Sequence, residues 1–258
     1  MTDKLQLDEP AEGVARLTIA NPDRRGALDH EILDELARLA RTLEARCLVI
    51  RGSGSVFSAG YDIGNLDEGP FERAAERLVA HPFHAAIEAL EGFEYPVVGQ
   101  LNGHAIGGGL ELALTCDIRL AADTARFSMP PAKLGLVYSH TGLRKFIDVC
   151  GVANTAELFF VGHAIDADRA ARMGLVNEVI DPDELEQRAL GLAAEIAANA
   201  PLSLAGNKRI IRALRARPLP DEVARELIEL REACFRSEDF REGVRAFAEK
   251  RKPRWRGR

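Results

Sequence analysis

Short β-rich runs alternate with amphipathic helical runs over roughly the first two thirds of the chain, and this alternation limits the possible folds more than any other feature. Asp29 can cap a helix whose apolar stripe is Ile32, Leu33, Leu36, Leu39, Ala40 and Leu43. Strands are expected at Val14–Ala20, Cys47–Ile50, Pro96–Leu101, Asp117–Ala121 and Ala125–Met129, and further helices around Phe71–Leu90 and near Gly108–Thr115. The pattern predicts an α/β core with parallel strand pairing.

From about Ile180 onward the periodicity is helical. Two apolar faces are visible there, one formed by Leu185, Ala189, Leu192, Ala193 and Ile196, the other by Val223, Leu227, Leu230 and Phe235. We therefore expect a core over residues 1–200 and a helical region over residues 201–258 that packs on the core, on another subunit, or on both.

Composition and charge exclude several classes of protein. The 258 residues carry a formal net charge of −6, which argues against a general nucleic-acid binder, although the tail after Lys250 is locally basic. No run is long and apolar enough to span a bilayer, and Met1–Gly13 shows no secretory signal. Four widely spaced cysteines without a CxxC pair indicate reduced thiols of a cytoplasmic protein. His81 and His84 lack the partners of a metal site.

The glycine-rich segment Gly103–Glu111 is the most informative motif for chemistry. No dinucleotide fingerprint or P-loop is present. Glycines at a helix start leave backbone N–H groups bare at the positive end of the helix dipole, where an oxyanion can bind. Glu111 lies three residues beyond Gly108 and projects on the same helical face. Proton transfer beside an activated carbonyl is one interpretation, and close packing of glycines is the other.

A second loop, Arg51–Gly60, is also rich in glycine and serine. Its small residues Ser58, Ala59 and Gly60 would let the backbone approach a ligand closely. Asp62 follows and could equally cap the next turn.

Taken together, these segments resemble the crotonase superfamily, that is, the enoyl-CoA hydratase/isomerase family. The matching stretches are Val14–Leu28, Leu48–Ile63, Pro96–Ala121, Phe127–Leu143, Gly162–Ile180 and Phe240–Arg254. The resemblance implies a spiral of ββα units with a helical C-terminal region, assembly as a homotrimer or hexamer, and a coenzyme A thioester as substrate. It implies no metal or redox cofactor.

The resemblance also assigns catalytic positions. It places the thioester carbonyl between the N–H groups of Tyr61 and Gly108, where an enolate would be stabilised. Glu111 matches the first of the two glutamates of the hydratases. The position of the second is occupied by Pro131. Either Glu111 performs both tasks, another group assists it, or the reaction differs.

Tyr138, Ser139 and His140 follow Pro131 closely and are candidates for the missing group; His104 is another nearby proton donor. The segment from Phe127 to Tyr138 is most similar to methylmalonyl-CoA decarboxylase-like members, in which a tyrosine at the place of Tyr138 contributes to the site. The match is incomplete where those members have a histidine and this chain has Tyr61. A half-buried tyrosine with a satisfied hydroxyl is the structural alternative.

Contacts to coenzyme A are implied at a separate set of positions. Arg24 and Arg25 resemble the family segment that lies beside the adenine and phosphates, although Gly26 replaces its usual asparagine. Lys250 is the tail residue expected to reach a phosphate. The remaining implied contacts are Ala27, Leu28, Ser58, Ala59, Asp62 and Ile63.

Three functions are thus compatible with the sequence. The first is a hydratase or isomerase of 2-enoyl-CoA with Glu111 as acid/base. The second is an acyl-CoA decarboxylase that uses Tyr138 with the same oxyanion hole. The third is a CoA-binding relative without turnover.

Overall fold

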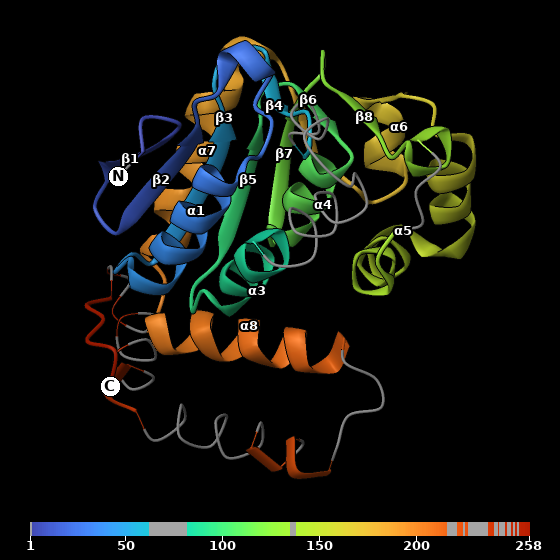
Figure 1. Ribbon diagram of the computed structural model, residues 1–258. Coiled ribbons are helices and arrows are strands. Elements are labelled where there is room, and N and C mark those ends of the chain that lie inside the picture. The colour runs from blue at the N-terminus through green and yellow to red at the C-terminus, as the bar shows by residue number, and fades with distance from the viewer. Residues whose placement is uncertain are drawn as a thin grey trace.

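The larger sheet is the frame of the molecule (Figure 1). A computed structural model describes residues 2–61, 82–134 and 138–215 and parts of 221–258. The sheet order is β1-β2-β3-β5-β7-β10, and only β1 runs antiparallel to its neighbour. Its strands are β1 (Leu5–Ala11), β2 (Val14–Ile19), β3 (Cys47–Gly52), β5 (Val97–Leu101), β7 (Ile118–Ala122) and β10 (Glu178–Ile180). The predicted parallel α/β core is confirmed; β1 was not anticipated.

A second, smaller sheet stands at the end of the first. Its strands, in order, are β4 (Val56–Ser58), β6 (His104–Ile106), β8 (Arg126–Ser128) and β9 (Ile165–Asp166). β3, β5 and β7 are each followed along the chain by one of these short strands, and β4, β6 and β8 pair in parallel. The expectation that residues 51–60 form only a loop was wrong, because β4 lies within them.

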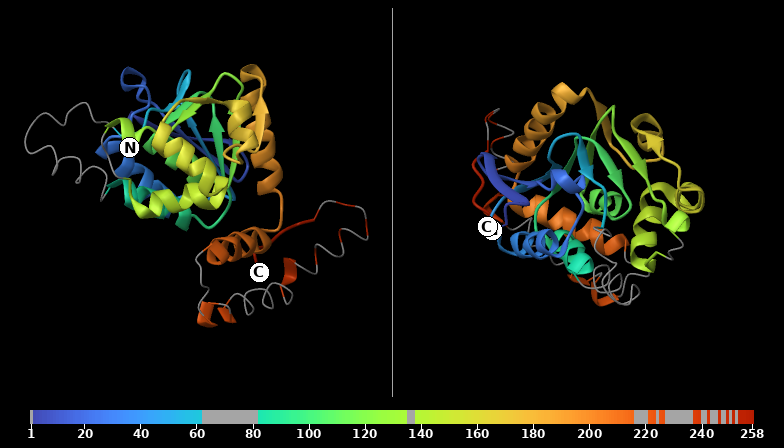
Figure 2. Two further views of the ribbon diagram at one scale, coloured as in Figure 1. Left: turned by 90° about the vertical axis from the view of Figure 1, so that its right-hand side faces the viewer. Right: turned by 45° about the horizontal axis from the view of Figure 1, so that its top comes forward.

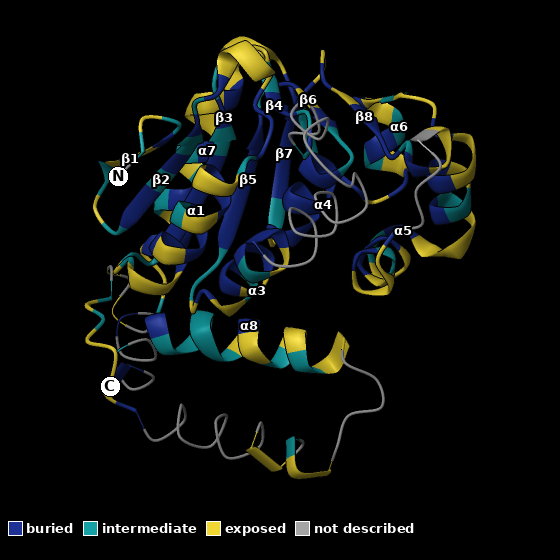
Figure 3. Ribbon diagram, in the orientation of Figure 1, coloured by how far each residue is buried: buried dark blue, intermediate teal, exposed yellow. Residues whose placement is uncertain are grey.

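Helices cover both faces of the larger sheet (Figure 3). On β5, Val97 and Leu101 enter the core beneath α1 (His30–Thr42), α3 (His84–Gly92) and α4 (Gly108–Thr115), whereas Val98 enters the core beneath α7 (Pro182–Ala197). Successive side chains of a strand point to opposite faces, so a parallel strand covered on both sides is apolar throughout. The predicted stripe on α7 packs there through Leu185, Ala189, Ala193 and Ile196.

Local sequence signals set several helix boundaries. The Asp29 carboxylate accepts the N–H of Ile32 at 3.0 Å, which confirms the predicted cap of α1. α5 (His140–Val161) begins at Ser139 and is kinked at Gly151, whose φ of 76° is not helical. Further elements in the described part of the chain are α6 (Ala167–Arg172), α8 (Pro201–Arg215) and the 3-10 turns η1 (Pro22–Arg24) and η3 (Pro131–Leu134). The expected helix over Phe71–Leu90 lies outside the described residues up to 81.

α8 lies below the sheet layers, as the left view of Figure 2 shows. Lys208 joins the helix to these layers. The Lys208 ammonium donates to the Tyr95 carbonyl at 2.8 Å and to the Asp117 carboxylate at 2.7 Å. That carboxylate also accepts the Val97 N–H at 2.7 Å. The Lys208 side chain is only 7% exposed, so these contacts replace its hydration. This cluster joins α8 to the edge where β5 and β7 begin.

Cys47, Cys116 and Cys150 are free thiols and buried, as predicted, and burial raises the pKa of Cys47 to about 12. Among the described residues, no group of three or more His, Cys, Asp or Glu side chains is arranged to hold a metal. In the same part of the chain no single helix could cross a membrane. One bent pair, α7 with α8, passes the test of length and apolarity only when joined across a 105° bend.

The Lys208 cluster yields a stability prediction. Lys208→Met should lower the free energy of unfolding by about 2 kcal/mol, because the Asp117 carboxylate and the Tyr95 carbonyl lose a buried donor. Arg209→Met on the same helix is the control; Arg209 pairs with Glu226 at the surface, and its loss should be much smaller. Urea unfolding measures both. Equal losses would contradict the role given to Lys208.

Candidate active site

Two glycine-containing segments meet where β3 and β5 end. β3 leads through β4 to Tyr61, and β5 leads through β6 to Gly108. Gly60 has a φ of +89°, and a Cβ there would lie 2.7 Å from the Ile106 carbonyl oxygen. Only glycine accepts that conformation and that approach without strain. The pairing of β4 with β6 therefore fixes the backbone of residue 61 beside the start of α4.

The first turn of α4 presents backbone amides to this junction. The N–H groups of Leu110 and Glu111 bond to the Gly107 carbonyl, at 3.0 Å and 3.1 Å. Within the described residues, neither the Tyr61 N–H nor the Gly108 N–H donates to a backbone carbonyl. The Tyr61 ring packs on Gly108, where an added Cβ would lie 2.9 Å from Tyr61 Cε1. The arrangement places two amide donors near the positive end of a helix dipole.

Glu111 is a carboxylate on a helix that is buried on every side. All eight residues of α4 are buried, and Glu111 is 4% exposed. Its Oε2 accepts the Tyr138 hydroxyl at 2.5 Å, and the Tyr138 and Tyr61 hydroxyl oxygens are 3.3 Å apart. A buried carboxylate with so few partners is costly, and such groups concentrate at functional sites.

The first turn of α5 packs against the side chains of Glu111 and Tyr138. A Cβ on Gly142 would lie 2.9 Å from Glu111 Oε2 and 2.5 Å from Tyr138 Cε1, so glycine leaves the space that they occupy. Ser139 and His140 are exposed at this helix start, and the Ser139 hydroxyl accepts the Gly142 N–H at 3.1 Å. Of the three residues expected to supply the missing group, only Tyr138 contacts Glu111.

Burial is the largest cause of the pKa shifts of Glu111, Tyr138 and Tyr61. Loss of hydration raises the pKa of Glu111, while the Tyr138 hydrogen bond and the nearby Lys145 ammonium oppose that rise. Burial also raises the pKa of Tyr138 and of Tyr61 above the usual tyrosine range, with the Glu111 charge acting in the same direction. Both phenols are therefore neutral at physiological pH, and Glu111 holds a proton more readily than a surface glutamate.

Most of the residues to which the resemblance assigns coenzyme A contacts lie in two segments, 24–28 and 58–59, which are joined by hydrogen bonds. Arg24 and Arg25 are exposed, whereas Ala27, Leu28 and Ser58 are buried. The Arg25 carbonyl accepts the Ala59 N–H at 3.1 Å, the Gly60 carbonyl accepts the Leu28 N–H at 2.7 Å, and the Ser58 hydroxyl donates to the Gly26 carbonyl at 2.7 Å. This network holds the loop from 21 to 28 against Tyr61. Asp62, Ile63 and Lys250 lie outside the described residues.

Other sequence candidates point elsewhere. His104 is exposed on β6, and its Nδ1 accepts the Arg126 N–H at 3.1 Å. His84 is on α3, where its Nε2 lies 3.0 Å from the Glu88 carboxylate. Pro131 is buried at the start of η3 and carries no proton to exchange. Neither histidine therefore has a direct contact with Glu111.

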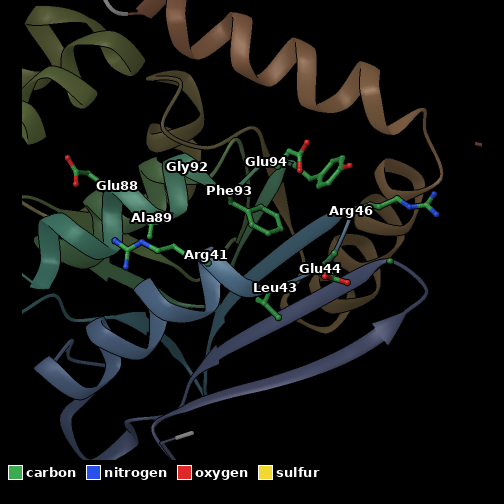
Figure 4. Close-up of a pocket in the computed structure, with 13 residues that line it drawn as sticks. Arg41, Leu43, Glu44, Arg46, Glu88, Ala89, Gly92, Phe93 and Glu94 are labelled. Carbon is green, nitrogen blue, oxygen red and sulfur yellow. The ribbon is translucent and has the colours of Figure 1, made fainter. Parts of the chain in front are cut away.

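Two large cavities lie apart from Glu111. One, of about 930 Å³, is lined by Leu43 and Phe93 together with charged side chains such as Arg41 and Arg46 (Figure 4). Arg46 and Phe93 precede β3 and β5, so this cavity is at the edge where the parallel strands begin. The other, of about 1210 Å³, lies between α5 and α8 and includes His140. Ligands of open α/β sheets bind at the opposite edge, where strands end, which is where Tyr61 and Gly108 meet.

Comparison with known proteins shows the family to which this fold belongs. The Enoyl-CoA hydratase/isomerase family profile matches residues 9–258. This chain belongs to that family. A probable enoyl-CoA hydratase of Bacillus subtilis is 34% identical over 256 residues, which is 95% of each chain. The methylmalonyl-CoA decarboxylase of Escherichia coli is 34% identical over 237 residues, or 90% of each.

A solved structure of Pseudomonas aeruginosa DspI superposes with a TM-score of 0.90 at 35% identity, covering 99% of this chain and 97% of that one. An enoyl-CoA hydratase from Bacillus anthracis also reaches 0.90, at 26% identity over 99% and 100% of the chains. The crotonase fold expected from the resemblance is confirmed. The chain is thus an acyl-CoA enzyme of the enoyl-CoA hydratase/isomerase family.

The sequence did not indicate every residue that lies around Glu111 and Tyr138. Tyr61 was singled out for its backbone N–H, but its hydroxyl also reaches Tyr138 across 77 residues of sequence. Gly142 was not singled out at all. A polar aromatic residue directly after a Ser-Ala-Gly run was the available signal for Tyr61, whereas nothing local marks Gly142.

The raised pKa of Glu111 makes a prediction about stability and pH. The folded chain binds this proton more tightly than the unfolded chain, so ionisation costs stability as pH rises through and above the ordinary glutamate range. Glu111→Gln should raise the melting temperature at about pH 8, and the gain should shrink towards about pH 4. The exposed Glu195→Gln on α7 is the control in calorimetry. A gain that is independent of pH would contradict the burial argument.

Gly142 allows a second prediction. Gly142→Ala should lower the free energy of unfolding by about 1–3 kcal/mol, because the new methyl overlaps Glu111 and Tyr138. Gly191→Ala on α7 meets no atom within 4 Å and should instead stabilise, by about 1 kcal/mol or less. Urea unfolding of both variants should therefore give opposite signs. Matching signs would show that α5 yields at this point.

Proposed function

We propose that this chain hydrates or isomerises a 2-enoyl-CoA, with Glu111 as the acid/base. The observation that carries the proposal is the buried Glu111 carboxyl in the first turn of α4, beside the Gly108 amide and hydrogen-bonded to Tyr138. Family membership supplies the thioester class, and the Bacillus subtilis relative supports the reaction class.

In the proposed mechanism the thioester carbonyl oxygen accepts the N–H groups of Tyr61 and Gly108. Negative charge develops on that oxygen as the enolate forms, and the dipole of α4 favours it there. A fixed donor of this kind contributes about 10²–10³ to the rate. The packed junction of β4, β6 and α4 keeps the two donors in place without reorganisation.

Glu111 then moves the protons. In hydration it takes a proton from the water whose oxygen bonds to Cβ, and it returns a proton to Cα as the enolate collapses. In isomerisation it removes a proton from one carbon and delivers it to another. The place of the second family glutamate is held by Pro131, so one carboxyl performs both tasks. Its raised pKa brings its two protonation states closer in energy, which suits a group that must both accept and donate.

Decarboxylation is the second candidate, and a specific contact favours it. The Tyr138 hydroxyl faces Glu111 inside the site, and the Escherichia coli relative is a methylmalonyl-CoA decarboxylase. In that reaction the bond between Cα and the carboxylate breaks, CO₂ leaves, and the electron pair forms the same enolate. A proton from Tyr138 or Glu111 then completes Cα.

The remaining parts of the proposal concern binding and assembly. Arg24 and Arg25 are exposed beside the loop that is held against Tyr61, where they can meet coenzyme A phosphates. Lys250 is proposed to assist them. We further propose that the enzyme works without a metal or redox cofactor, forms homotrimers or hexamers, and is cytoplasmic.

A panel of 2-enoyl, 3-enoyl and malonyl-type CoA thioesters tests the reaction by liquid chromatography with mass spectrometry. We expect one 2-enoyl thioester to gain a water or to convert to its 3-enoyl isomer. Glu111→Gln should lower that rate by about 10²–10⁴, while Glu195→Gln leaves it unchanged.

Other outcomes of the panel select among the alternatives. Loss of CO₂ from a malonyl thioester, abolished by Tyr138→Phe, would replace hydration with decarboxylation. Retained CoA binding without any conversion would indicate a relative that has lost turnover.

A further inference from the structure

Two of the three tyrosines of the chain form a line of hydroxyl groups that ends on Glu111. Tyr138 donates to Glu111 Oε2 at 2.5 Å, and the Tyr61 hydroxyl oxygen lies 3.3 Å from that of Tyr138. Glu111 and Tyr138 are buried, whereas Tyr61 is partly exposed. The line therefore joins a buried carboxyl to a residue that is partly exposed.

Counting protons shows what this line can do. A phenol carries one proton, so when Glu111 is ionised Tyr138 must donate to it, and the Tyr138 oxygen is left to accept from Tyr61. When Glu111 is protonated, its own proton can be donated to Tyr138, and Tyr138 can donate to Tyr61. Protonation of Glu111 thus allows both hydrogen bonds to run in the opposite direction.

Among the residues that the structure describes, aromatic rings pack against the two phenols. The Tyr61 ring meets the edge of Phe83 with centroids 4.8 Å apart, and the Tyr138 ring meets Phe159 at 5.4 Å. These apolar contacts hold the rings without engaging their hydroxyls. In the described part of the chain, the Tyr61 hydroxyl thus faces that of Tyr138, and the Tyr138 hydroxyl faces both Tyr61 and Glu111.

Charged groups near Glu111 are occupied elsewhere. On α5, Lys145 forms an ion pair with Glu91 of α3, and His84 faces Glu88 on α3. These groups act on Glu111 through charge alone. Within the described residues, the hydrogen-bonded route from the Glu111 carboxyl runs through Tyr138 to Tyr61.

We propose that Tyr138 and Tyr61 form a proton relay that exchanges the Glu111 proton with solvent during turnover. The inference rests on the acid/base role proposed for Glu111. In one passage, solvent water gives a proton to the Tyr61 oxygen, the Tyr61 proton moves to Tyr138, and the Tyr138 proton moves to Glu111. Both phenols end neutral, Glu111 ends protonated, and hydroxide remains in solvent; the reverse passage discharges Glu111. Tyr61 thus contributes a hydroxyl to proton transfer in addition to its backbone N–H.

The relay can be separated from a structural role by measuring isotope exchange. In D₂O, Glu111 removes a Cα proton from the saturated thioester that matches the accepted acyl group, and the relay replaces it with deuterium before return. Tyr61→Phe keeps the ring, its Phe83 contact and the N–H. It should lower the ratio of Cα exchange to substrate turnover about tenfold, as should Tyr138→Phe. A merely structural loss would lower both rates together and leave the ratio unchanged.

Tyr95→Phe is the matched control, because this third tyrosine lies before β5 at the opposite edge of the sheet; it should leave both rates unchanged. An unchanged ratio in Tyr61→Phe overturns the relay, and so does absence of exchange in the wild-type protein. Full exchange and turnover in Glu111→Gln would instead overturn the acid/base role, which is a different failure.

Fluorine spectroscopy gives an independent readout that does not need substrate. Protein grown with 3-fluorotyrosine has three fluorine positions, assigned with the three Tyr→Phe variants. Glu111→Gln should shift the resonances of both Tyr138 and Tyr61 and leave that of Tyr95 in place. A Tyr61 resonance that does not move shows that its hydroxyl is not coupled to Glu111, and overturns the proposal.

Discussion

The parallel pairing of β3 with β5 is the constraint on which the site depends. Their register, with Leu48 opposite Val97, makes the two strands end at one edge, and each then continues into a short strand of the smaller sheet. Because β4 and β6 pair as well, Gly60 is pressed against the Ile106 carbonyl. Tyr61 and Gly108, 47 positions apart in the numbering, thereby become neighbours with fixed amide directions. If β5 shifted by one residue relative to β3, each of its side chains would point to the opposite face of the sheet.

Burying the Glu111 carboxyl costs free energy, which the packing of the rest of the fold must offset. The carboxyl lies on a helix with no exposed face, and its hydration is replaced by one phenol and by the field of the helix start. The surrounding core, with Leu110, Leu112 and Phe146 fully enclosed, is large enough to hold such a group. The packed α/β layers therefore tolerate the unfavourable burial of a carboxylate at the candidate active site. The Lys208 cluster anchors α8 at the opposite edge of the sheet, away from Glu111.

Much of this was visible in the sequence, for identifiable reasons. The residues of α4 and the Asp29 cap were predicted because helix starts carry local signals in glycine, aspartate and apolar spacing. The strands β4 and β6 were missed because each has only three residues and lies within a glycine-rich segment, whereas the equally short β8 was predicted within Ala125–Met129. Glu111 was found because it follows Gly108 by three residues on the same helical face and because it matches the first glutamate of the family resemblance. The contact of Tyr138 with Tyr61 joins two loops that only the paired sheets bring together, and the outward directions of His104 and His140 follow from backbone geometry that composition does not encode.

The resemblance places Pro131 where a second glutamate would stand, and in the site that we propose this difference, with Tyr138 beside Glu111, changes the electrostatics. Two buried carboxylates at short distance repel each other, and one is forced to hold a proton. A phenol beside Glu111 donates to the ionised form without adding charge, so a single negative charge is buried and its proton affinity is set mainly by burial. In the mechanism that we propose, one carboxyl does the work that two acids would divide, and it needs a neutral partner that can both give and receive a proton. A tyrosine hydroxyl meets that requirement, whereas the side chain of Pro131 cannot.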